Sequence, residues 1–123
     1  MDKYLRGNLQ KRIERTLEAL RKNRYEAEYI ETPQELLKRL DELMPQGSSC
    51  SVGGSITLSE AGVVDYLKSG RFTYYDRYAP NANADEVFLK AMSCDFYLTS
   101  SNAITEEGEL YNIDGNGNRV AAM

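Results

Sequence analysis

Two glycine-rich segments of this 123-residue sequence carry residue types that could bind an anion. The first is Gly53-Gly54-Ser55-Ile56-Thr57, which lies between an expected strand and an expected helix. Glycines let a ligand approach the backbone, and free N–H groups at a helix start attract phosphate or carboxylate. Ser55 and Thr57 add hydroxyl donors. The alternative is an ordinary strand-to-helix turn in which Thr57 caps the helix.

The second segment is Gly115-Asn116-Gly117-Asn118-Arg119, preceded by Asp114. Alternating Gly and Asn favour positive φ angles and concave arrangements of backbone N–H groups. Arg119 is suited to hold a carboxylate or a phosphate. The Gly-x-Gly-x-x-Gly spacing of a dinucleotide-binding turn is absent. The segment therefore indicates a small-anion site, with a flexible surface loop as the alternative.

Several polar residues near these segments are candidates for proton transfer or orientation of a ligand. Asn102 follows an expected strand, where it could point into a cleft or form a turn. Asp114 and Glu60 are the nearest carboxylates, although Glu60 also fits a helix cap. Asp76 and Arg77 end another strand and could reach the site or pair with each other on its rim.

Composition and charge exclude several classes of function. The formal net charge is −4, which argues against nucleic acid as a partner. No apolar run is long enough to span a membrane, and no signal peptide opens the chain. The two cysteines, Cys50 and Cys94, fit reduced thiols, and without histidine they cannot hold a metal or an iron–sulfur cluster alone. We expect a cytoplasmic protein in which this chain holds no cofactor.

The sequence pattern alternates strands with helices. Apolar spacing and cap residues predict helices at about 9–23, 33–44, 57–69 and 85–93, strands at 25–30, 49–52, 72–76 and 95–99, and a hairpin at 103–105 and 109–113. Thr32, Pro33 and Glu35 form a strong helix-start signal. The alternation predicts a single α/β domain over residues 1–123, with a mostly parallel sheet and crossover helices.

Ligands of such sheets bind beyond the carboxyl ends of the strands. The segments Gly53–Thr57, Thr99–Thr105 and Asp114–Arg119 all follow expected strands. We therefore expect these three segments, which are far apart in sequence, to converge in space and form one site.

The sequence also resembles a known family. Val52-Gly53-Gly54-Ser55-Ile56-Thr57-Leu58, Asp76-Arg77-Tyr78, and the stretch from Thr99 to Met123 resemble the LUD domain, the lactate-utilisation protein C family. The resemblance implies a Rossmann-like fold similar to the NagB/RpiA/CoA-transferase group, whose cleft binds sugar phosphates or CoA thioesters. It also implies an association with iron–sulfur subunits that oxidise L-lactate to pyruvate, in which the partners hold the clusters.

Two departures from these families bear on function. Related isomerases carry an acidic residue where this sequence has Asn102, and a lysine where it has Asp114. An amide cannot shuttle protons, so the departure favours binding over isomerisation. LUD domains usually continue beyond Met123 into another strand, so we expect a C-terminally incomplete sheet and self-association into a homo-oligomer.

Three functions follow from these patterns. The first is a LUD-type module that binds a small anion, such as an organic acid, a sugar phosphate or a CoA ester. The second is an enzyme acting on such compounds, for which Glu106, Glu107 or Glu109 would be the candidate nucleophile of a CoA transferase. The third is a scaffold without a ligand. The sequence does not decide whether the chain is an enzyme.

Overall fold

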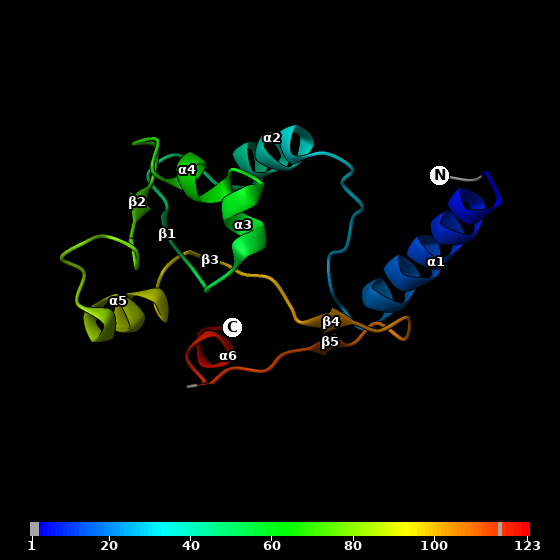
Figure 1. Ribbon diagram of the computed structural model, residues 1–123. Helices are drawn as coiled ribbons and strands as arrows, with labels where there is room; N and C mark the ends of the chain where they lie inside the picture. The colour runs from blue at the N-terminus through cyan, green and yellow to red at the C-terminus, as the bar shows by residue number, and fades with distance from the viewer. Residues whose placement is uncertain (1–2, 116) are drawn as a thin grey trace. The chain divides into compact units, whose positions relative to one another are not determined.

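The computed structural model describes residues 3–115 and 117–123, and of Asn118 it describes the backbone (Figure 1). The chain divides into two compact units. The first combines Met1–Ile30 with Ser101–Asn112, and the second combines Glu31–Ser100 with Ile113–Met123. No helix in the described part of the chain is long and apolar enough to cross a membrane.

The second unit is built on a parallel sheet, as predicted for an α/β fold. Strands β1 (Ser49–Val52), β2 (Thr73–Tyr74) and β3 (Phe96–Leu98) are ordered β2-β1-β3. Cys50 of the central strand pairs with Tyr74 on one side and Phe96 on the other. Because the strands are parallel, their carboxyl ends all lie at the same edge of the sheet.

Alternation along the strands gives the sheet two different faces. Cys50 and Val52 join an apolar cluster with residues of helices α2 (Pro33–Leu43), α3 (Ile56–Glu60) and α4 (Val63–Leu67), which lie close together in Figure 1. Ser51 lines a hollow with residues of α5 (Ala84–Ala91). Successive strand residues point to opposite faces, so α5 covers the face opposite the core.

The predicted start of α2 is confirmed, whereas the prediction of one long helix after β1 is wrong. The Thr32 side chain accepts a hydrogen bond from Glu35 N at 3.2 Å, and Pro33 occupies the first turn of α2. The helix predicted from Thr57 to Gly70 is instead two short helices, because Gly62 adopts a left-handed conformation with φ of 80°.

The residue that caps α3 also differs from the prediction. Ser55, not Thr57, is its N-cap, since the Ser55 hydroxyl accepts a hydrogen bond from Leu58 N. A capping box would therefore need an acidic residue at 58, and Glu60 is the last residue of α3 instead.

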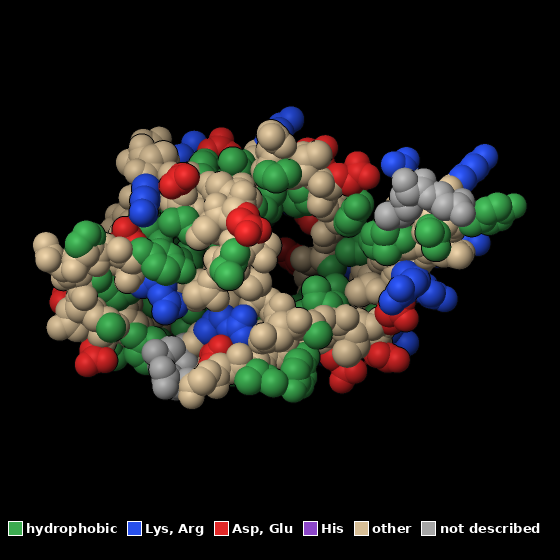
Figure 2. Space-filling model, viewed as in Figure 1, with side chains coloured by type: hydrophobic (Ala, Val, Ile, Leu, Met, Phe, Trp, Pro, Cys, Tyr) green, Lys and Arg blue, Asp and Glu red, His purple; other side chains and the backbone are tan. Residues whose placement is uncertain are grey.

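The first unit pairs a long helix with a hairpin. Helix α1 (Lys3–Lys22) carries basic and apolar side chains that are exposed together, as Figure 2 shows. Strands β4 (Ala103–Ile104) and β5 (Leu110–Tyr111) are antiparallel, which confirms the predicted hairpin.

The strand predicted at 25–30 is not a strand of any described sheet. Tyr25 N donates to the carbonyl of Leu20, and the Arg21 guanidinium donates two hydrogen bonds, of 2.9 and 3.1 Å, to the carbonyl of Ala27. Helix α1 thus satisfies backbone groups that a neighbouring strand would otherwise pair. The side chains of residues 25–30 still alternate as in a strand, but the backbone does not form the hydrogen bonds of a described sheet.

The hairpin turn lies directly on the backbone of α1. A Cβ added to Gly108 would lie 2.5 Å from the carbonyl carbon of Ala19. The Asn23 amide donates to the carbonyls of Glu107 and Gly108, and Arg12 donates to the Glu106 carboxylate at 2.7 Å. The first unit therefore depends on a glycine at this contact.

We expect Gly108→Ala to destabilise the protein more than Gly47→Ala. Both residues have positive φ, so each alanine costs about 1–2 kcal/mol in backbone conformation. Gly47 has open space around its Cβ position, whereas Gly108 contacts the helix backbone, which adds roughly 1–3 kcal/mol. Urea unfolding followed by far-ultraviolet circular dichroism measures both variants, and equal losses would contradict the contact.

Candidate functional site

The turn after β1 is fastened to the end of β3 within the second unit. Gly53 N donates to the carbonyl of Leu98 at 2.9 Å. The Ser100 hydroxyl donates to the Ser55 hydroxyl at 3.0 Å, while Ser55 caps α3. These bonds bring the first glycine-rich segment beside the residues that follow β3.

Arg119 joins the third segment to the same place. Its residue is only 9% exposed, and its guanidinium donates to the Asp114 carboxylate at 3.0 Å, the Ser100 carbonyl at 2.7 Å and the Ile113 carbonyl at 3.2 Å. The three segments were predicted to converge, and the residues of each that belong to the second unit do lie together. These bonds engage all three nitrogens of the guanidinium, and the Asp114 carboxylate balances its charge.

Asp114 is held as a carboxylate by two donors. Its second oxygen accepts a hydrogen bond from Val120 N at 2.6 Å, in the first turn of α6 (Asn118–Ala122). This bond and the contact with Arg119 hold the pKa of Asp114 below its ordinary value of 3.8. At neutral pH Asp114 is ionised and has no proton to donate, so its position favours a structural role over acid catalysis.

The two neighbouring glycines have different surroundings. Gly53 is buried, and a Cβ there would lie 2.8 Å from both Arg119 Cγ and Thr99 Oγ1. Gly54 is exposed, and its Cβ would lie 3.5 Å from Arg77 Nη1, an ordinary contact. Gly53 therefore serves the packing of Arg119, whereas Gly54 leaves an accessible backbone beneath a guanidinium.

Arg77 is the cation that faces this open turn. Among the described residues its guanidinium makes no hydrogen bond or ion pair, and it lies 5.6 Å from the centroid of the Tyr78 ring. Pairing with Asp76, one of the two alternatives considered from the sequence, does not occur among these residues. The Asp76 carboxylate instead accepts from Tyr78 N at 2.8 Å and lies 3.6 Å from Lys68 Nζ.

The remaining predicted residues lie at other positions of the fold. Thr57 is exposed within α3, and Gly115 is exposed before α6. Gly117 has φ of 73° and precedes α6, of which Asn118 is the first residue. Asn116 lies outside the described residues. Asn102 belongs to the first unit, where it is exposed just before β4.

The cysteines are not suited to nucleophilic chemistry. Burial, together with the nearby Cys94, raises the pKa of Cys50 to about 11, and burial also raises the pKa of Cys94. Both side chains are therefore thiols at neutral pH. Within the described ranges, no cluster of three potential metal ligands occurs.

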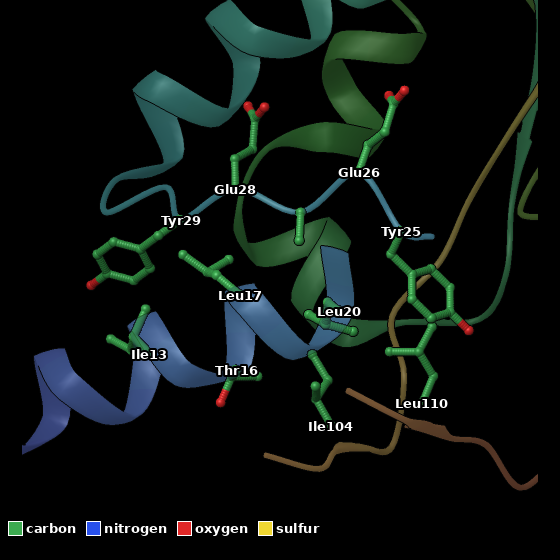
Figure 3. A pocket seen from close by; sticks show the side chains of 11 residues that line it. Ile13, Thr16, Leu17, Leu20, Tyr25, Glu26, Glu28, Tyr29, Ile104 and Leu110 are labelled. Carbon is green, nitrogen blue, oxygen red and sulfur yellow. The ribbon is translucent and has the colours of Figure 1, made fainter. Parts of the chain in front are cut away.

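Each unit contains a hollow that the sequence did not reveal. In the first unit, apolar residues of α1 face Tyr25 and Tyr29 across a hollow of about 440 Å³, while Glu26 and Glu28 point away (Figure 3). Ala27 also lines this hollow. In the second unit, a hollow of about 100 Å³ lies between the sheet and α5, with Arg77 in its lining. The alternation of Tyr25, Ala27 and Tyr29 with glutamates was a signal for the first hollow.

Fold and site together define an α/β protein in which turns beyond a parallel sheet converge on a buried arginine. A comparison with protein families matches the LUD domain over residues 13–123, and the chain belongs to this family. Searches of curated proteins and of solved structures find no match to the chain.

We expect Gly53→Ala to destabilise the protein and Gly54→Ala to leave its stability nearly unchanged. Alanine at 53 forces Arg119 and Thr99 apart and costs about 1–3 kcal/mol. Alanine at 54 meets no close atom and needs no positive φ, so stability stays within roughly 0.5 kcal/mol. Chemical denaturation measures both, and a tolerated alanine at 53 would show that Arg119 does not pack as described.

We expect the effect of Asp114→Asn on stability to depend on pH. Since the folded pKa of Asp114 is lowered, its carboxylate stabilises the fold above about pH 3.8, and this contribution disappears as the pH falls through the folded pKa. The variant should therefore melt below the wild type at pH 7, and the difference should be smaller at pH 3. The control is Asp65→Asn, at an exposed residue of α4, and an equal difference at both pH values would contradict the prediction.

Proposed function

We propose that the chain is a LUD-type domain of organic-acid utilisation that binds a small anion at the turns following β1 and β2. The observation that carries the proposal is the position of Arg77, whose guanidinium lies over the exposed backbone of Gly54 without a carboxylate partner among the described residues. An uncompensated guanidinium beside accessible backbone attracts a carboxylate or a phosphate.

The neighbouring charges support Arg77 rather than Arg119 as the cation that meets the ligand. Arg119 is neutralised by Asp114 and is already hydrogen-bonded to two carbonyls. Asp76, the acidic neighbour of Arg77, is directed to Lys68 and to the backbone of Tyr78. The positive potential of the site therefore comes from Arg77.

Family membership supports lactate or a related organic acid as the metabolic context. In this proposal the chain acts beside subunits that hold iron–sulfur clusters and oxidise lactate. The residues support such a division of labour, since the pKa of each cysteine thiol is raised. Association with such subunits, and of the chain with itself, is part of the proposal.

Isomerase and CoA-transferase activities have weaker support from the residues. Asp114 is held ionised by Arg119, where an isomerase would place a lysine. Glu106, a candidate nucleophile for acyl transfer, pairs with Arg12 and lies 3.9 Å from Arg15, which lowers the pKa of its carboxyl group. Neither geometry favours these activities over binding.

Calorimetric titration with L-lactate, pyruvate, inorganic phosphate and acetyl-CoA tests the proposal. We expect at least one anion to bind the wild type, and Arg77→Gln to weaken it roughly tenfold or more, because a charge-assisted contact is lost. Arg6→Gln removes the same charge from exposed helix α1 and should leave affinity unchanged. The proposal is wrong if no anion binds, or if both variants bind like the wild type.

A further inference from the structure

The hollow between the sheet and α5 gives the proposed anion site an apolar side. Val87, Phe88 and Ala91 of α5 line it, and Ser51 of β1 and Tyr97 of β3 form the opposite wall. Arg77 also lines this hollow, so the cation that lies over Gly54 is part of the same cavity.

The polar groups of the hollow are unequally available to a ligand. The Ser51 hydroxyl donates to the carbonyl of Tyr75 at 3.0 Å and is therefore engaged. No hydrogen bond of the Tyr97 phenol is found among the described residues, and burial raises its pKa, so it is a neutral donor. Arg77 supplies the positive charge that faces the cavity.

The size of the hollow restricts its occupant. Its volume of about 100 Å³ is well below the roughly 300–1,000 Å³ of sites for drug-sized ligands. A sugar phosphate or the body of a CoA ester would not fit inside. A single cation beside an apolar wall matches a ligand that has one negative charge and a short carbon chain.

We propose that this hollow binds short-chain monocarboxylates, with the carboxylate on Arg77 and the carbon chain against Val87 and Phe88. The inference rests on the proposed function and specifies its ligand class. The turn of Gly54 lies next to the carboxylate, and α5 determines how long the chain can be.

A series of acetate, propionate, butyrate and hexanoate, titrated into the full chain by calorimetry at low ionic strength, tests the inference. Affinity should rise with chain length until the hollow is filled and then fall. Arg77→Gln should weaken every acid roughly tenfold or more. Val87→Ala should weaken the short acids roughly fourfold, because apolar contact is lost, and should shift the optimum toward a longer acid.

Leu89→Ala is the matched control, since Leu89 lies on the same helix but is 66% exposed and outside the hollow. Circular dichroism verifies that each variant is folded. If anion binding depends on Arg77 but is insensitive to chain length and to Val87→Ala, or if phosphate binds and the acids do not, the inference is overturned and the proposed function stands. If no anion binds the wild type, both are overturned.

Discussion

The second unit depends on the burial of one guanidinium. Placing a charged side chain in the interior costs several kcal/mol unless the charge is paired and its donors are satisfied. Arg119 meets this requirement with the Asp114 carboxylate and two backbone carbonyls. The same contacts connect the end of β3 to the segment before α6, and they require that Gly53 have no side chain.

This constraint separates the residues that build the site from those that can meet a ligand. Arg119 and Asp114 neutralise each other, and the Ser55 hydroxyl accepts hydrogen bonds from the Ser100 hydroxyl and from Leu58 N at the start of α3. A charged group that is already neutralised and hydrogen-bonded within the protein gains less from a ligand than one that has no such partner. In the proposed function, recognition is therefore assigned to Arg77, which no carboxylate among the described residues neutralises.

Features that depend on neighbouring residues were predictable from the sequence. The cap of α2, strands β1 and β3 and the β4–β5 hairpin follow from cap residues, apolar runs and turn residues. The break at Gly62 was missed because apolar spacing continues across it. The segment 25–30 alternates like a strand, but Arg21 satisfies one of its carbonyls, which is a tertiary contact that periodicity does not encode.

The candidate site also combines features that sequence neighbours determine with contacts between residues that are distant in sequence. The meeting of the glycine-rich segments could be predicted, because the ends of parallel strands meet at one edge of a sheet. The role of each residue could not, because it depends on pairs such as Arg119 with Ser100 and Gly53 with Arg119, which are distant in sequence. A motif that combines glycine with arginine is typical both of a site that binds an anion and of a buried ion pair within the protein. The difference lies in whether a carboxylate such as Asp114 neutralises the guanidinium, and for Arg119 it does. The glycine-rich segments of this chain therefore contribute to its architecture through the burial of Arg119, and the charge that we propose for ligand binding is that of Arg77, beside Gly54.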